Sequence, residues 1–478
     1  MHDDLFTRRQ AMAGALSLSA LQAIGQQRSK RPNILFAIAD DHSYLHTSSA
    51  GYKSVSTPNI DRIGQTGVRF THSFCSSPSC TPSRGAILTG QHFWRLEEGG
   101  NLWSRLSKKF IGYPDLLEAA GYHVGLQGKG WGPGNLEAAG RTRNPAGANF
   151  AGFGAFLESR PKDKPFCFWF GSTDPHRPYD KGSALKAGFR LEDIEVPTWL
   201  PDAPEVRKDI AEYLFEVQRF DRDVGAILAA IEKAGELENT LVVVTSDNGM
   251  PFPGAKTNLY DSGTRMPLAI SWPAAVRGGR VVDDFVSHTD FAPTFLAAAG
   301  LAIPESMIGR SLLPLLQSKK AGIVEKERDR VFTGRERHTQ MRAGGVGYPM
   351  RAVRTRDFLY VRNYETDRWP SGDPPHFGDI DNGPSKEFVV SHKDSPEFGR
   401  FYQLACAKRP AEELYDLKLD SAQQVNVARE PKYASSRAKF SKMLDDGLKK
   451  GQDPRATGQT IIWDSSPYYG GANPQSRK

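Results

Sequence analysis

The stretch NILFAIADD, residues 33–41, decides the fold class of this 478-residue chain. Its apolar run ends abruptly in two carboxylates, which is typical of a buried strand in a parallel sheet. The segments PFCFWFGSTDPH at 165–176 and TLVVVTSDNG at 240–249 repeat this pattern. Segments with helical periodicity lie between these runs, among them PDLLEAAG at 114–121 and the long segment 203–235. The alternation predicts an α/β fold, with a large, mainly parallel sheet between helices.

Polar residues gather just past the ends of two of these predicted strands. Asp40 and Asp41 end the first apolar run, and Asp247 and Asn248 end the run at 240–246. Open α/β sheets bind ligands beyond the carboxyl ends of their strands. Carboxylate and amide oxygens are the ligands that Ca²⁺ prefers, so the four residues predict a Ca²⁺ site. Taken singly, each pair also fits a helix cap or an exposed turn.

The character of the sequence changes near residue 340. The segment 348–364, YPMRAVRTRDFLYVRNY, has the pattern of amphipathic strands, and 435–451 has that of a late helix. We therefore predict a catalytic domain over residues 28–342 and a smaller C-terminal α+β subdomain with an antiparallel sheet over 343–478.

Composition excludes several classes of function. The formal net charge of +7 is mild and favours an anionic substrate. No run of Lys and Arg interleaved with aromatic residues indicates a nucleic-acid surface, and we expect no nucleic-acid partner. The four cysteines are too few for a disulfide framework, and no C-x-x-C pair indicates zinc.

The N-terminal segment carries a targeting pattern. In TRRQAMAGALSLSALQAIG, at 7–25, Arg8 and Arg9 precede a modestly apolar stretch. This pattern resembles a twin-arginine export signal over residues 1–27, with a solvated amphipathic leader as the alternative. It predicts a periplasmic or secreted protein, with the twin-arginine export machinery as a partner. The apolar stretch is too short to anchor the chain, and we predict no membrane span in the mature protein.

Three cationic or titratable side chains follow predicted strands. Lys129 in QGKG and Lys256 in PGAKTN lie in glycine-containing loops, where a backbone can approach a ligand closely. A lysine in such a loop can neutralise an oxyanion as a point charge, although a solvated lysine is the simpler interpretation. His176 in DPHRP would lie beside the metal site, where it could act as a general acid.

Cys80 starts the segment CTPSR at 80–84, which GAILTG follows. A bare thiol nucleophile needs a histidine or a helix N-terminus to lower its pKa, and the local sequence has no cysteine-protease-like constellation. The segment instead resembles the signature of the type I sulfatases. Further segments resemble that family in the same order: RPNILFAIADDH, TPNIDRIGQTGVRFTHSF, DPHRP, TSDNG and HTDFAPTFL. The strings TSDNGMPFPGAKTNLYDSGTRMPL and GYPMRAVRTRDF resemble its sulfamidase (N-sulfoglucosamine sulfohydrolase) branch.

The resemblance implies an alkaline-phosphatase-like fold and assigns roles to the polar residues. It implies that a maturation enzyme oxidises Cys80 to formylglycine, and that Arg84 holds the formylglycine hydrate. Lys129 and Lys256 would contact sulfate oxygens, and His176 would protonate the leaving group or contact the sulfate. The family's Ca²⁺ ligands correspond to Asp40, Asp41, Asp247, Asn248 and the modified Cys80.

The chain departs from the family pattern in the string GKGW. Many sulfatases carry a histidine where this chain has Trp131, which could pack against a sugar ring or lie in the core. Some sulfamidases have arginine where this chain has Lys256, so the bond cleaved, N-sulfate or O-sulfate, stays open. Candidate saccharide contacts, each with a structural alternative, are Trp131, Arg177, His338, Arg351 and His376.

Together these features predict an exported, Ca²⁺-dependent formylglycine sulfatase acting on a sulfated saccharide. The resemblance favours a heparan N-sulfatase in glycosaminoglycan degradation. The alternatives are an O-sulfatase acting on another polysaccharide, a phosphodiesterase or phosphonate monoester hydrolase of the same superfamily, and an unmatured carbohydrate-binding relative.

Overall fold

The computed structural model describes residues 31–471, and within them eight strands form one sheet. Their order across the sheet is β4-β3-β5-β1-β6-β7-β2-β8, so the first strand of the chain lies near the centre. The strands are β1 (Asn33–Ala39), β2 (Val68–Phe74), β3 (His123–Gly128), β4 (Ala148–Asn149), β5 (Phe166–Gly171), β6 (Thr240–Ser246), β7 (Arg265–Ser271) and β8 (Arg280–Ser287).

The sheet is mainly parallel, as predicted. Strand β1 pairs in parallel with β5 on one side and with β6 on the other. Strand β7 is the exception, because it runs antiparallel to both β6 and β2. The chain leaves β6 at the carboxyl end and enters β7 from that same edge, so it runs back without a full crossover.

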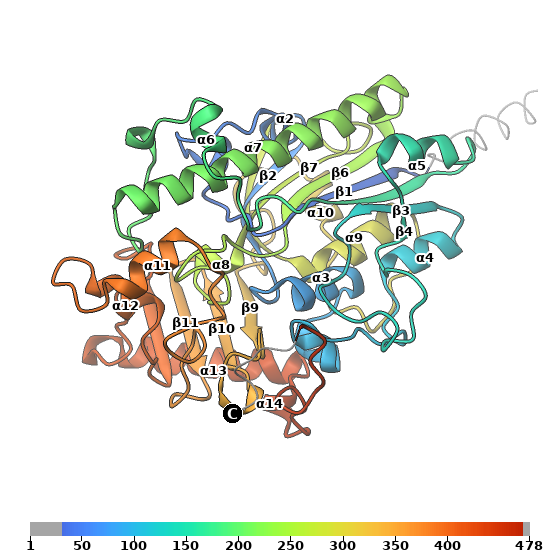
Figure 1. Ribbon diagram of the computed structural model, residues 1–478. Coiled ribbons are helices and arrows are strands. Elements are labelled where there is room, and N and C mark those ends of the chain that lie inside the picture. Colours follow the sequence, from blue (N-terminus) through green and yellow to red (C-terminus); the bar gives the residue numbers. More distant parts are fainter. Residues whose placement is uncertain (1–30, 472–478) are drawn as a thin grey trace, which may run out of the picture.

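Helices cover both faces of this sheet (Figure 1). Alternate β1 side chains point to opposite faces. Ile34, Phe36 and Ile38 belong to the core beneath α3, α4, α9 and α10, whereas Leu35 and Ala37 belong to the core beneath α2, α5 and α7. The helices are α2 (Pro58–Thr66), α3 (Cys80–Thr89), α4 (Tyr113–Ala119), α5 (Phe153–Ser159), α7 (Pro204–Lys233), α9 (Phe291–Ala298) and α10 (Leu313–Gln317).

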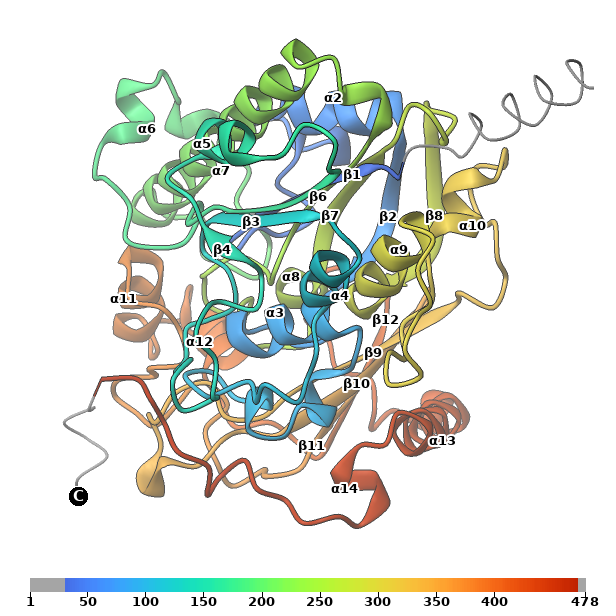
Figure 2. The ribbon, with the colours of Figure 1, turned by 90° about the vertical axis from the view of Figure 1, so that its right-hand side faces the viewer.

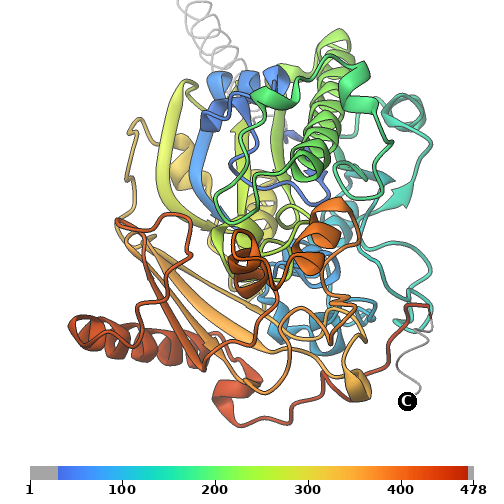
Figure 3. The same cartoon turned by 60° about the vertical axis from the view of Figure 1, so that its left-hand side comes forward.

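A second, antiparallel sheet of four strands lies beside the first in the described part of the chain, in the order β12-β11-β10-β9 (Figure 2). Helix α13 packs against β9, β10 and β11 (Figure 3). The elements of this part are β9 (Arg330–Arg335), β10 (Met350–Thr355), β11 (Phe358–Asn363), β12 (Glu412–Asp416), α11 (Pro384–Ser391), α12 (Gly399–Ala405), α13 (Ala434–Lys450) and α14 (Pro454–Thr457). The antiparallel C-terminal sheet was predicted, but β9 precedes the predicted boundary at 342/343 and belongs to this sheet.

Two further helices, α6 (Ser183–Lys186) and α8 (Asp261–Thr264), are each a single turn long. Within residues 31–471, no helix combines the length and the apolarity needed to cross a bilayer. The predicted export signal over 1–27 lies outside the described residues, so export stays a prediction.

Candidate active site

The four predicted metal ligands meet where β1 and β6 end. The two strands are parallel neighbours with Ala39 opposite Ser246, so Asp40 and Asp247 leave the sheet side by side. All four side chains are buried, with at most 2% of each residue exposed. Asp247 Oδ1 accepts a hydrogen bond from the Asp41 backbone at 3.1 Å, and Asn248 Nδ2 donates to Asp41 Oδ1 at 2.6 Å. Asp41 has φ of 74°, an uncommon conformation that turns its side chain into this cluster.

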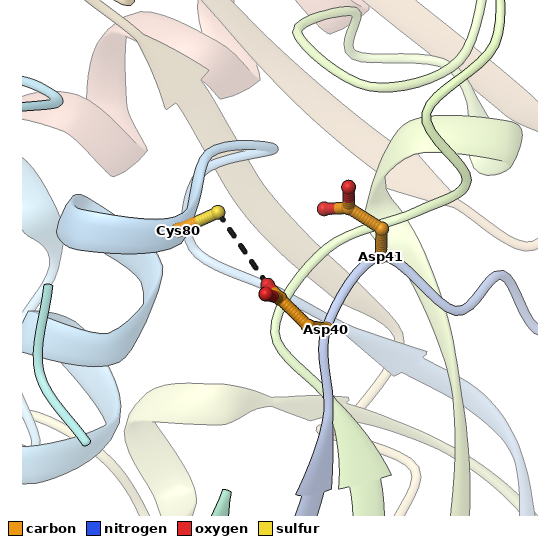
Figure 4. Close-up of side chains that lie close together, drawn as sticks. All are labelled: Asp40, Asp41 and Cys80. Atoms are coloured by element: carbon orange, nitrogen blue, oxygen red, sulfur yellow. Dashed lines mark hydrogen bonds between the residues drawn. The ribbon is translucent and has the colours of Figure 1, made fainter. Parts of the chain in front are cut away.

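Cys80 enters the cluster from the first residue of α3. Its Sγ lies 3.7 Å from Asp40 Oδ1, and Asp41 faces it from the other side (Figure 4). One ligand atom from each of these three residues lies within 4.8 Å of the other two. Burial raises the pKa of the Cys80 thiol well above its usual value, and Lys129 and Lys256 offset this only in part. The thiol is therefore protonated at neutral pH and is not a thiolate nucleophile.

Arg84 lies one turn after Cys80 on the same face of α3. Its Nε donates to Asp247 Oδ2 at 2.7 Å, and its Nη1 donates to the Lys129 carbonyl at 2.7 Å. The guanidinium is fully buried and also approaches Asp40 Oδ1 at 3.5 Å. Arg84 therefore ties α3 to the end of β6 and to the loop after β3. Its predicted contact with a formylglycine hydrate stays a prediction.

The two predicted lysines each bind one aspartate of the cluster. Lys129 Nζ lies 2.7 and 2.6 Å from the carboxylate oxygens of Asp40, and Lys256 Nζ lies 2.8 Å from Asp41 Oδ2. Burial acts to raise the pKa of Asp40, but Lys129 and Arg84 hold that pKa well below its usual range. For Asp41 burial prevails over Lys256, and the pKa rises to about 6.

The oxygens of this cluster fit a hard divalent cation. Three carboxylates and one amide converge, and the buried Asn248 Oδ1 has no hydrogen-bond partner among the described residues. A buried carbonyl oxygen without a donor is costly, and a cation ligated by it would remove that cost. Asp40, Asp41, Asp247 and Asn248 would hold the ion, and the all-oxygen donor set suits Ca²⁺.

His176 lies beside the cluster in a defined tautomer. Its Nδ1 is 2.6 Å from the Arg177 carbonyl oxygen, which can only accept, so Nδ1 carries the hydrogen. Its Nε2 lies 3.8 Å from Asp41 Oδ2. In the neutral ring Nε2 is therefore an acceptor, and it needs a second proton before it can donate one to a leaving group.

Part of this site opens into a cleft of about 820 Å³. Of the predicted site residues, the cleft wall includes Asp40, Cys80, Lys129, Trp131, His176, Arg177, Lys256 and His338. The wall also includes residues that sequence reasoning missed: Trp103, Asp174, Glu216, Arg219, Thr339 and Asp381. Asp381 matters most to the anion site, because its Oδ2 lies 2.9 Å from Lys256 Nζ. No motif or strand end marks it in the sequence.

Comparison with known proteins identifies the family. The sequence model of the sulfatase family matches residues 32–140 and 146–301, which is more than half of the chain. The chain belongs to the sulfatase family. A second model, described as the C-terminal part of N-sulphoglucosamine sulphohydrolase, matches residues 255–374 of this sulfatase.

Relatives along the whole chain agree with this assignment. The sulfatase is 29% identical to human (Homo sapiens) N-sulphoglucosamine sulphohydrolase, covering 90% of this chain and 92% of the relative. It is 26% identical to an ulvan-active sulfatase of Formosa agariphila, covering 88% and 80%. A protein solved with its substrate D-glucosamine-2-N,6-O-disulfate shares the fold, with a TM-score of 0.63 and 22% identity over 89% of this chain and 99% of the other. The predicted family, enzyme class and fold are thereby confirmed.

Two of the predicted saccharide contacts lie away from the cleft of this sulfatase. Arg351 is fully buried and pairs with Glu336 and Asp453, so its charge is used in holding the C-terminal part together. His376 is exposed but does not line the cleft. Arg351 lies in strand β10 and His376 lies in the loop between β11 and α11, and neither residue lines the cleft that contains Cys80.

The other three predicted contacts line the cleft, but each is already buried or bound to another residue. Trp131 is 4% exposed and packs into the main core, which is the second of the two interpretations that the sequence allowed for this residue. Arg177 is held by both carboxylate oxygens of Asp209 at 2.7 Å, so its charge is already paired. His338 accepts or donates a hydrogen bond through Nδ1 at Ser79 Oγ, 2.8 Å away, and burial lowers its pKa to about 3. A neutral His338 thus borders the residue that precedes Cys80.

Proposed function

We propose that this sulfatase hydrolyses the N-sulfate of glucosamine residues in a glycosaminoglycan such as heparan sulfate, using Ca²⁺ and a formylglycine made from Cys80. The observation that carries the proposal is the position of Cys80. It lies between a four-residue oxygen cluster and two lysines, in a cleft wide enough for a saccharide. The match of residues 255–374 to the C-terminal part of N-sulphoglucosamine sulphohydrolase supports the choice of N-sulfate.

Each group supplies a separate part of the reaction. A bound Ca²⁺ would act as a Lewis acid on sulfate oxygens, and hydrated formylglycine would supply the hydroxyl that attacks sulfur and a second hydroxyl that allows sulfate to leave. Lys129 and Lys256 place ammonium groups where negative charge redistributes on the sulfate. Arg84 pairs with the carboxylates of Asp247 and Asp40 and holds them in place.

His176 is the proton donor of this proposal. Departure of the amine requires a proton on nitrogen as the N–S bond breaks. The Arg177 carbonyl fixes the hydrogen on Nδ1, so the transferred proton comes from Nε2, which faces the cleft beside Asp41. One carboxylate oxygen each of Asp41 and Asp381 lies within 4.8 Å of a ring nitrogen of His176.

The experiment pairs mass spectrometry with sulfate release. Protein from its native host should carry an aldehyde at position 80, and it should release sulfate from D-glucosamine N-sulfate faster than from D-glucosamine 6-O-sulfate. EDTA should abolish release and Ca²⁺ should restore it. C80S, which keeps one hydroxyl and lacks the second, should stop turnover after the first attack.

Three outcomes would contradict the proposal. A plain thiol at position 80 in active protein would exclude formylglycine. Faster release from the 6-O-sulfate would make the enzyme an O-sulfatase. A preference for an aryl phosphodiester over any sulfate would make it a phosphodiesterase.

We further propose that the enzyme is exported by the twin-arginine route, on the pattern of Arg8 and Arg9 before an apolar stretch. Cell fractionation of the native host tests this. The wild-type protein should be found in the periplasm or the medium, and the R8K/R9K variant should stay in the cytoplasm.

A further inference from the structure

A second group of charged side chains lines the cleft, apart from the sulfate-binding lysines. It consists of Asp174 after β5 and of Glu216 and Arg219 on α7, and we call it the Arg219 cluster. Arg219 donates from Nε and Nη2 to the two carboxylate oxygens of Asp174, both at 2.5 Å. Glu216 Oε1 lies 3.3 Å from Arg219 Nη2. The mechanism derived above uses none of these side chains.

The cluster is rigidly built, yet it stays open to the cleft. Asp174 and Glu216 are 5% and 2% exposed, whereas the Arg219 side chain is 38% exposed. The bidentate pair with Asp174 fixes the plane of the guanidinium. Nη1 of Arg219 has no hydrogen-bond partner among residues 31–471. Arg219 therefore presents a preorganised donor to whatever occupies the cleft.

The main chain connects this cluster to the reaction centre. The Asp174 carbonyl accepts a hydrogen bond from the Asp40 backbone at 2.9 Å, so the cluster begins next to a metal ligand. His176, the proposed proton donor, follows Asp174 by two residues. A substrate bound at the sulfate site would extend along this wall.

The charges of the cluster select the chemistry of its ligand. Arg219 offers donors, and Glu216 offers an acceptor whose pKa rises to about 7 through burial and the neighbouring Asp174 carboxylate. A second sulfate or a carboxylate would meet two acidic side chains, Asp174 and Glu216, and only one cation, Arg219. It would therefore be repelled. A sugar hydroxyl is neutral and both donates and accepts, so it can bind Arg219 and Glu216 together.

We propose that Arg219 and Glu216 form a subsite that binds hydroxyl groups of the sugar ring carrying the scissile sulfate, with Asp174 positioning Arg219. Trp103, which lines the same cleft and is half-buried, offers the aromatic face that such a ring can contact. The inference rests on the proposed function, because it assumes a sulfated sugar at the neighbouring anion site.

The test separates binding of the sugar from binding of the sulfate. R219A should lower kcat/KM for D-glucosamine N-sulfate about 10- to 100-fold, mainly through KM, since it removes a charged hydrogen bond. The inhibition constant of inorganic sulfate, which has no sugar, should stay within about twofold, because the anion site is intact. R219K should lie between R219A and the wild type, and E216Q should raise KM with little change in kcat.

R222A is the matched control. Arg222 lies one turn further along α7, is exposed, and does not line the cleft. This variant should keep wild-type values for both the saccharide and sulfate. If R219A fails to fold, E216Q and R219K carry the test, with folding checked by thermal unfolding.

Several results would overturn the inference. Unchanged KM in R219K and E216Q, or an equal loss of saccharide and sulfate binding, would exclude a sugar subsite. A loss confined to D-glucosamine-2-N,6-O-disulfate would mean that Arg219 binds a second sulfate. A wild-type enzyme that releases no sulfate from any saccharide would refute the proposed function itself, and that result is independent of the variants.

Discussion

Asp40 and Asp41 are neighbours in the sequence, yet their carboxyl groups are perturbed in opposite directions. Two cations, Lys129 and Arg84, offset the burial of Asp40, whereas Asp41 has Lys256 as its close cation and Asp40 as a like charge. Both groups are buried, so the position of each cation decides which of the two carboxyl groups has the lower pKa when no metal is bound. The sequence predicted all five of these charged residues but not this pairing, because the pairing depends on how three loops meet.

Replacing Arg84 should destabilise the protein strongly. R84A leaves Asp247 buried without its cation and weakens the compensation of Asp40. Breaking such a buried pair should lower the free energy of unfolding by about 3–5 kcal/mol. Urea denaturation in EDTA measures this without a contribution from bound metal.

R62A is the control for that measurement. Arg62 pairs with Glu232 at 3.1 Å, but both side chains are about half exposed. Removing this pair should cost less than about 1 kcal/mol. Equal losses in R62A and R84A would mean that the buried network contributes no more than a surface pair.

The sequence reveals the element ends that build the metal site, but not the elements that complete the cleft. Asp40 and Asp247 follow long apolar runs, and parallel strands bring their carboxyl ends to one edge, so their meeting was predictable. Arg219 and Glu216 lie inside the helix over 204–233, where charged residues are expected on a solvated face. Asp381 comes from a loop with no strand or helix signal, and only the tertiary fold brings it to Lys256.

Strand β5 supports the active site through its last residue, Gly171. The Gly171 carbonyl accepts a hydrogen bond from the Lys129 backbone at 2.7 Å. A Cβ at Gly171 would lie 1.8 Å from the Lys129 carbonyl oxygen, so G171A must push the two segments apart. We expect a loss of about 1–3 kcal/mol in stability and a larger proportional loss in kcat/KM, because Lys129 moves away from Asp40 and from its place in the cleft.

Gly154 provides the control for the G171A variant. It lies in α5, and a Cβ there would meet nothing within 4 Å. G154A should leave activity unchanged and favour the helix by up to about 1 kcal/mol. If G171A kept full activity, the close approach of β5 to Lys129 would not be needed for placing that lysine.

The cleft is a property of the whole molecule, because both sheets supply its walls. Cys80, Lys129 and His176 come from the large sheet and its connections, whereas His338 and Asp381 come from the part of the chain that follows β9. Strand β9 lies on the N-terminal side of the predicted boundary at 342/343 and belongs to the second sheet. The helix that carries Cys80 is thus enclosed from both directions, and all ten residues of α3 are buried.

This enclosure predicts the order of events in maturation. An enzyme that oxidises Cys80 must reach the main chain around it, and in the folded protein residues 80–84 lie under the surface. We therefore expect modification to precede folding, and folding to precede export if the twin-arginine route is used. Folded, unmodified protein incubated with the maturation enzyme should keep its thiol, whereas the urea-unfolded chain and a peptide of residues 76–91 should be converted.

Peptide mass spectrometry after thiol alkylation distinguishes these outcomes, because only an unmodified Cys80 takes up the alkylating reagent. The same peptide with R84A is the control. If the maturation enzyme recognises the segment CTPSR at 80–84, this variant peptide should remain unconverted. Conversion of the folded protein as fast as the peptide would contradict the prediction. It would mean that α3 opens on the timescale of the reaction, and hence that the site stays accessible after the two sheets have assembled.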